Sequence, residues 1–192
     1  MKSMKMALIA LLAVSAGVAP AAFATVAQAT PSQGTGLICL TGGTSATCSV
    51  DRATGTATLD TSSGGFAAVY SASSTSSARV PIGDVSFSFT YNCSGTTYCE
   101  TGGSPRWSIP IVTDNGGSDG YAFIDWNSCG ISSAATSGTI DTSCGLYFGQ
   151  DFYSSWSAFA SAHPTFTIGT GGAFMVADEP FQGTISNFQF SY

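Results

Sequence analysis

Charged residues are scarce in this 192-residue chain: they make up 8% of it, and 5 Lys and Arg stand against 11 Asp and Glu. Histidine occurs once, at position 163. The hydrophobic content of 44% is too high for an intrinsically disordered chain, which combines few apolar residues with a high net charge. The shortage of cations excludes a nucleic-acid-binding protein, because such a protein needs a basic face.

Lysine is confined to the N-terminus, where Lys2 and Lys5 precede an apolar run from Met6 to Val18. This pattern, followed by small residues, is typical of a secretory signal peptide. The run is shorter than the roughly 20 residues that span a bilayer, so a signal peptide is favoured over a membrane anchor. We predict a signal peptide over residues 1–24, with cleavage after Ala29 as the alternative.

Removal of the signal peptide leaves 3 arginines against 11 acidic residues, a formal charge of −8. A surface of this sign repels phosphate backbones and anionic lipids. We therefore expect a secreted, extracellular protein with no nucleic-acid partner and no membrane association after cleavage. Residues 25–36 are predicted to form a loose N-terminal arm, and residues 37–192 a single domain.

All six cysteines lie beyond the signal peptide, and export delivers them to a compartment in which disulfides persist. Six cysteines allow 15 pairings. Short loops close most easily, which favours three local pairs, Cys39 with Cys48, Cys93 with Cys99, and Cys129 with Cys144. None of these spacings is the short Cys-x2–4-Cys typical of a zinc site. The even count also argues against a free catalytic thiol.

Alternation of apolar and hydroxyl residues at period two predicts strands throughout the domain. The clearest example is Val85–Tyr91, and shorter patterns occur at 56–59, 66–70, 107–112, 121–125, 166–168, 174–176 and 183–192. In the last strand, Ile185 has the opposite parity to Phe188 and Phe190, which predicts a β-bulge near Ser186-Asn187. The fold class predicted is an all-β, antiparallel β-sandwich.

One short amphipathic helix is predicted near residues 151–162. Asp151 is its expected N-cap, and Phe152, Trp156 and Phe159 would form an aromatic stripe packed on the sandwich. His163-Pro164 would end it. We therefore expect Trp156 in the core and His163 at the end of the helix, without a catalytic role.

A series of segments over residues 85–192 resembles a group of small secreted bacterial proteins of unassigned function. The segments are Phe87-Ser-Phe89, Gly102–Ser108, Asp119–Asp125, Trp156–Pro164, Val176–Pro180 and Ile185–Phe188. More loosely, the chain is similar to jelly-roll sandwiches of the carbohydrate-binding-module and concanavalin-like kind. This resemblance implies a jelly-roll-like sandwich. The Glu-x-Asp-x-x-Glu pattern of jelly-roll glucanases is absent, so it implies no catalytic residues.

Two sets of residues are candidates for binding. An aromatic ring can stack on a sugar, and Trp107 next to Arg106, or Trp126 next to Asn127, could form such a platform. Both tryptophans are also what a sandwich core contains, and this is the favoured interpretation. The second set, Asp114, Asn115, Asp119 and Asp125, offers the oxygen ligands of a structural calcium ion. A metal-free hairpin turn explains the same residues and is favoured over the ion.

Three hypotheses of function follow. A non-catalytic glycan-binding or cell-wall-binding module, with an extracellular polysaccharide as its partner, is the first and would expose aromatic side chains in a shallow groove. A structural or interaction protein of the envelope or extracellular matrix would bury all its aromatics. A glycoside hydrolase would need two converging carboxylates in a cleft, and no pair is singled out by its spacing.

Overall fold

The computed structural model describes residues 36–192 apart from residues 44, 96, 98, 100–102 and 115–117. The chain divides into two units, Met1–Thr30 and Pro31–Tyr192, and every described residue belongs to the second. The predicted signal peptide and residues 25–35 of the predicted arm therefore lie outside the described residues. Among the helices that are described, none has the length and hydrophobicity needed to cross a membrane.

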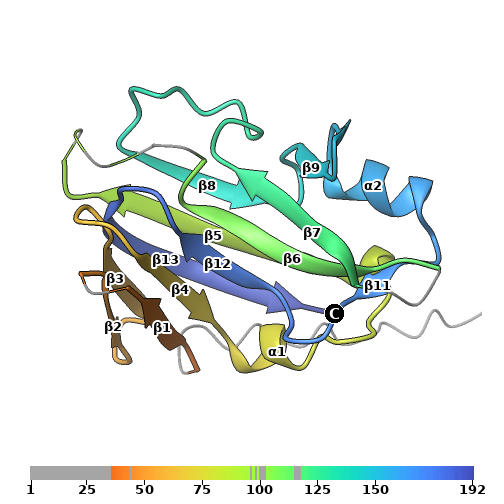
Figure 1. Cartoon of the computed structure of the whole chain (residues 1–192), viewed down its shortest axis with the longest axis horizontal. Coiled ribbons are helices and arrows are strands. Elements are labelled where there is room, and N and C mark those ends of the chain that lie inside the picture. The colour runs from red at the N-terminus through yellow and green to blue at the C-terminus, as the bar shows by residue number, and fades with distance from the viewer. Residues whose placement is uncertain (1–35, 44, 96, 98, 100–102, 115–117) are drawn as a thin grey trace, which may run out of the picture. The chain divides into compact units, whose positions relative to one another are not determined.

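Within the described residues, the strands form two antiparallel sheets (Figure 1). The larger sheet has the order β1 (Ile38–Gly42), β4 (Phe66–Tyr70), β12 (Phe174–Ala177), β6 (Arg106–Val112), β7 (Ser118–Asp125), β9 (Leu146–Phe148) and β10 (Asp151–Tyr153). A two-residue strand, β11 (Thr167–Ile168), pairs with the end of β6. The smaller sheet has the order β2 (Thr47–Asp51), β3 (Thr56–Asp60), β13 (Gln182–Ser191), β5 (Ser86–Cys93) and β8 (Ser137–Asp141).

The two sheets pack face to face, with β5 and β13 behind β6 and β12 in the view of Figure 1. Alternate residues of each strand point between the sheets and make one core. In β5 these are Phe87, Phe89 and Tyr91, all buried. This arrangement is the predicted all-β sandwich.

The predicted bulge in the last strand is confirmed. The pairing of β13 with β5 shifts register between Ser186 and Gln189, and Asn187 has a φ of 49°. The shift places Ile185, Phe188 and Phe190 on the core side of the same strand, where all three are buried. One extra residue therefore reconciles the two parities of the sequence.

The start of the predicted helix is wrong, whereas its end is confirmed. Helix α2 covers Trp156–Ala162, and its N-cap is Ser155, whose side chain accepts the N–H of Ala158 at 3.1 Å. Asp151 lies in β10, which forms a tight hairpin with β9. Trp156 is buried, and His163 is the C-cap residue, as expected.

Seven of the described elements were not predicted: the strands β1, β2, β8, β9 and β10, and two short helical elements. Helix α1 (Ala72–Thr75) lies in the Ser-rich stretch after β4, and a capping box at Ser71 and Ser74 begins it. A 3-10 turn, η1 (Ile82–Asp84), leads into β5. Serine side chains compete for backbone groups and so favour helix ends, which explains why such a stretch forms one turn and stops.

Disulfides join the three local pairs that the sequence favours, Cys39–Cys48, Cys93–Cys99 and Cys129–Cys144. They indicate an oxidising, extracellular-type environment. The first pair links β1 of the larger sheet to β2 of the smaller one. It therefore ties the two layers together at one edge of the sandwich.

We expect the double substitution Cys39→Ser/Cys48→Ser to lower the free energy of unfolding by about 2 to 3 kcal/mol, because the unfolded chain regains the entropy of an open loop. Urea unfolding followed by circular dichroism measures this loss. The matched control, Cys93→Ser/Cys99→Ser, opens a loop of 6 residues instead of 9 and should cost somewhat less. An unchanged urea midpoint in the first variant would contradict the expectation.

Candidate functional site

Trp107 is a core residue, as the favoured interpretation of the sequence had it, and the alternative of a binding platform at this residue is wrong. Its side chain has no exposed surface and packs against aromatic rings of β5 and β13 inside the sandwich. Its neighbour Arg106 has the opposite parity on β6 and therefore faces outward.

Trp126 and Asn127 follow the end of β7. Trp126 is half-buried against the core, and its indole N–H is buried without an acceptor among the described residues. Asn127 is exposed in the turn that follows, where its carbonyl accepts the N–H of Gly130. These two residues do not form an open aromatic platform.

The exposed aromatic groups lie on the outer face of the larger sheet. Of the eight large hydrophobic residues that are exposed in the described part of the chain, seven belong to this sheet and point away from the core: Ile38, Leu40, Phe66, Tyr121, Phe123, Tyr147 and Phe152. The eighth, Tyr192, follows the last strand of the smaller sheet. An apolar surface concentrated on one face marks a site of interaction.

Strand register arranges the centre of this face as one row perpendicular to the strands. Phe152 pairs with Tyr147, Tyr147 with Phe123, and Phe123 with Ser108. On the other side of β6, Ser108 pairs with Phe174. Neighbouring strands lie about 4.8 Å apart, so side chains in such a row succeed one another at that interval. Ser108 is small and is buried between Phe123 and Phe174 in this row.

Ring contacts continue this row toward β4. The ring centroids of Tyr70 and Phe174 are 5.3 Å apart, those of Phe174 and Tyr121 are 6.0 Å apart, and those of Tyr121 and Phe123 are 6.1 Å apart. Tyr147 and Phe152 form a second pair at 5.1 Å. We call Tyr70, Phe174, Tyr121, Phe123, Tyr147 and Phe152 the aromatic row.

Burial, together with the nearby phenol of Tyr121, raises the pKa of Tyr70 above its usual range. The Tyr70 hydroxyl is therefore protonated at neutral pH and can donate a hydrogen bond. The row thus offers polar contacts as well as ring faces.

A buried serine organises the one ion pair found in the described residues. Arg106 makes a bidentate pair with Asp178, and its guanidinium carbon lies 5.1 Å from the centre of the Phe123 ring. Ser104 donates to Asp178 at 2.9 Å and accepts the N–H groups of Asp178 and Glu179. These contacts neutralise the arginine and hold it flat beside the aromatic row.

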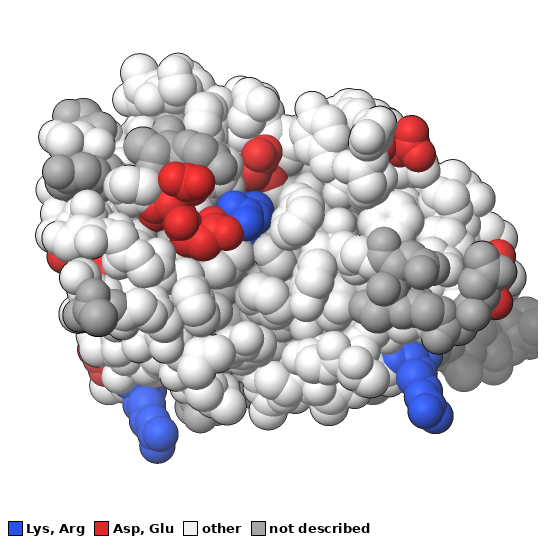
Figure 2. Space-filling view, in the orientation of Figure 1, with Lys and Arg blue, Asp and Glu red and all other residues white. Residues whose placement is uncertain are grey.

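Figure 2 shows a mostly uncharged surface, with one cationic group among several acidic ones near its centre and two further cationic groups that project at its lower edge. Because Arg106 is already paired, it is not available to a negatively charged ligand. The face is therefore suited to an uncharged partner.

Two of the proposed calcium ligands, Asp114 and Asp125, lie far apart. Asp114 precedes β7 and Asp125 ends it, and eight residues of strand hold these two carboxylates roughly 25 Å apart. Asp125 instead accepts the N–H of Ser128 at 2.7 Å in a turn. Asn115 and the side chain of Asp119 lie outside the described residues. In the described part of the chain, no three His, Cys, Asp or Glu residues are grouped as metal ligands would be.

Most residues of the aromatic row were missed by sequence reasoning, although one signal was present. Tyr121 and Phe123 share a parity that opposes Ala122 and Ile124, and the apolar pair Ala122 and Ile124 indicates the core side. Phe152 was instead assigned to the core-facing stripe of a helix. No sequence pattern indicated that Tyr147, Phe123 and Phe174 lie in register.

The chain matches no protein-family model, and no curated protein or solved structure is significantly similar to it.

Proposed function

We propose that this is a secreted, non-catalytic glycan-binding or cell-wall-binding protein that holds an uncharged polysaccharide on the aromatic row. The observation that carries the proposal is the row itself. Three of its members, Phe123, Tyr147 and Phe152, are register neighbours on adjacent strands and are 38%, 43% and 54% exposed. The jelly-roll-like resemblance of the sequence supports the same class of protein.

Exposed aromatic rings suit a sugar because the apolar C–H face of a pyranose packs on a ring while its hydroxyls remain in water. Because the row is perpendicular to the strands, it suits an extended polymer that crosses several strands better than it suits a single sugar. The charge balance of −8 after signal cleavage favours a neutral polymer over an acidic one. No catalytic pair is needed for this role.

The test is retention of the purified mature protein on insoluble neutral polysaccharides and on peptidoglycan. We expect the double substitution Phe123→Ala/Tyr147→Ala to weaken binding to the retained polymer by about 5- to 150-fold, because two stacking contacts of roughly 0.5–1.5 kcal/mol each are lost. Both side chains are exposed, so the variant should remain folded by circular dichroism.

Tyr192→Ala is the matched control, since it removes an equally exposed aromatic residue outside the aromatic row. Its retention should equal that of the unmodified protein. Failure of the unmodified protein to bind any of the polymers would overturn the proposal. Equal losses in Tyr192→Ala and in the double variant would show that the row has no special role.

A second candidate is a structural or interaction protein of the cell envelope. The observation that favours it is the aliphatic end of the same face, where Ile38 and Leu40 of the edge strand β1 are half-exposed. Branched aliphatic side chains pack well against protein and offer no flat face to a sugar. Sedimentation of the protein alone, across a range of concentrations, separates this candidate from a glycan-binding monomer.

A further inference from the structure

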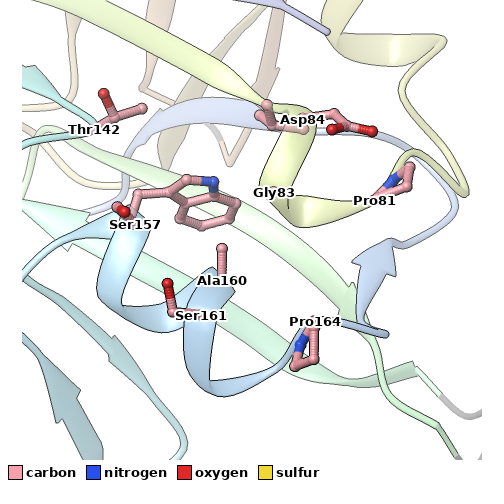
Figure 3. A pocket seen from close by; sticks show the side chains of 10 residues that line it. Pro81, Gly83, Asp84, Thr142, Ser157, Ala160, Ser161 and Pro164 are labelled. Carbon is pink, nitrogen blue, oxygen red and sulfur yellow. The ribbon is translucent and has the colours of Figure 1, made fainter. Parts of the chain in front are cut away.

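A pocket of about 470 Å³ lies between η1 and α2, on residues that do not belong to the aromatic row (Figure 3). Its volume is in the range of small-ligand pockets, roughly 300–1,000 Å³. Pro81, Gly83 and Asp84 come from the η1 side, and Trp156, Ser157 and Ser161 from α2. Thr142, which follows β8, contributes from the smaller sheet.

The side of the pocket formed by Trp156 is held rigidly. The indole N–H donates to the carbonyl of Ile82 at 2.8 Å, and the backbone N–H donates to the carbonyl of Thr142 at 3.1 Å. Trp156 is 3% exposed, so it closes the pocket on the core side. Both sides of the pocket are thereby fixed before any ligand arrives, which lowers the entropic cost of binding.

The polar side chains of the pocket are exposed, or half-buried in the case of Thr142, and are open to a ligand. Within the described residues, the side chains of Asp84, Thr142, Ser157 and Ser161 have no hydrogen-bond partner, although many other serines of the chain bond to backbone. Ser157 and Ser161 are four residues apart on α2 and therefore lie on the same side of that helix. The pocket thus presents one carboxylate and three hydroxyls together.

Apolar surfaces lie next to these groups. Pro81, Pro164 and Ala160 line the pocket together with the indole of Trp156. A ligand that fits must combine several hydroxyls with a compact apolar face. Asp84 supplies the only charge of the lining, so an anionic ligand is disfavoured.

We propose that this pocket binds a single neutral sugar ring, free or at the end of a glycan chain. Asp84 accepts hydrogen bonds from two ring hydroxyls, the serine and threonine hydroxyls donate and accept around the rim, and Pro81 and Pro164 contact the C–H face. This site goes beyond the proposed function, because it uses different residues and takes one sugar instead of an extended polymer.

Gly83 allows a sharp test. A Cβ at this position would meet no heavy atom within 4 Å, and Gly83 is not among the glycines with a positive φ. Gly83→Leu should therefore fold normally while it adds bulk to the lining of the pocket. Gly36→Leu is the matched control, since a Cβ at Gly36 also meets open space.

Calorimetric titration with glucose, galactose, mannose and N-acetylglucosamine measures the binding. We expect at least one of these sugars to bind, Gly83→Leu to weaken it by tenfold or more, and Asp84→Asn to weaken it by about tenfold through loss of hydrogen bonds to a charged acceptor. Gly36→Leu should bind as the unmodified protein does.

Absence of binding by all four sugars would overturn the proposal, as would equal binding by Gly83→Leu. Binding of tetramethylammonium without binding of any sugar would also overturn it, because the carboxylate would then serve a cation. Retention on insoluble polysaccharide reports on the aromatic row separately. Gly83→Leu should still be retained on the polysaccharide. Phe123→Ala/Tyr147→Ala should still bind the small sugar in the calorimetric titration.

Discussion

Replacing Trp107 by alanine should lower the free energy of unfolding by about 3–5 kcal/mol, the range found when a large aromatic residue is removed from a core. The ring of Trp107 lies at the centre of an aromatic cluster, with centroid distances of 4.8 Å to Phe188, 5.3 Å to Phe87, 5.6 Å to Phe89 and 5.9 Å to Phe190. These four residues come from two strands of the opposite sheet. Removal of the indole therefore leaves a cavity between the layers that neither backbone can close.

Urea unfolding followed by far-ultraviolet circular dichroism measures the loss, and Phe152→Ala is the control. Phe152 is 54% exposed on an edge strand, so its removal should change stability by no more than about 0.5 kcal/mol. Trp107→Phe should cost less than Trp107→Ala, because it keeps a ring in the cluster and removes an indole N–H that has no acceptor in the described structure. A cost for Trp107→Ala as small as that for Phe152→Ala would contradict the buried position.

Eight of the thirteen described strands and all three disulfides could be predicted because local sequence determines them, whereas β1, β2, β8, β9 and β10 were missed. Val85–Tyr91 alternates strictly and lies mostly within β5, and the conflict of parity around Ser186 correctly predicted a bulge. The cysteine pairs are close in sequence, so loop entropy alone favoured the observed bonds. In each case the deciding interaction joins residues that are near each other along the chain.

The aromatic row and the start of α2 could not be predicted in this way. Phe123, Ser108 and Phe174 lie side by side only because β7, β6 and β12 pair in one particular register, and single-sequence patterns carry no information on pairing between distant strands. Asp151 and Ser155 are both good N-cap residues. The pairing of β9 with β10, a tertiary interaction, decided between them in favour of Ser155.

Parity also explains the wrong choice of binding tryptophan. Arg106 and Trp107 are neighbours in sequence, which suggested one site, but neighbours on a strand point to opposite faces. Arg106 lies beside the aromatic row, whereas Trp107 lies in the core. The polar neighbour was thus a correct indicator of a surface feature, and the ring that accompanies it is Phe123 on the adjacent strand.

The second large effect is expected at Gly172, in the loop between β11 and β12. Its φ is 69°, and a Cβ there would lie 1.9 Å from the carbonyl oxygen of Ser74 and 2.8 Å from the Cα of Thr75. That carbonyl also accepts the N–H of Ala173 and the hydroxyl of the buried Ser77. A methyl group at position 172 must therefore push α1 away from the loop and break contacts that bury backbone groups.

Gly171→Ala is the matched control, because Gly171 has a φ of 92° and a Cβ there would meet open space. It should cost about 1–2 kcal/mol from backbone strain alone. Gly172→Ala carries the same strain and in addition the cost of overpacking against backbone, about 1–3 kcal/mol, so its total should be about 2–5 kcal/mol. Urea unfolding of the two variants measures the difference. Equal losses would mean that α1 moves away without cost, and that its contact with the β11–β12 loop does not stabilise the fold.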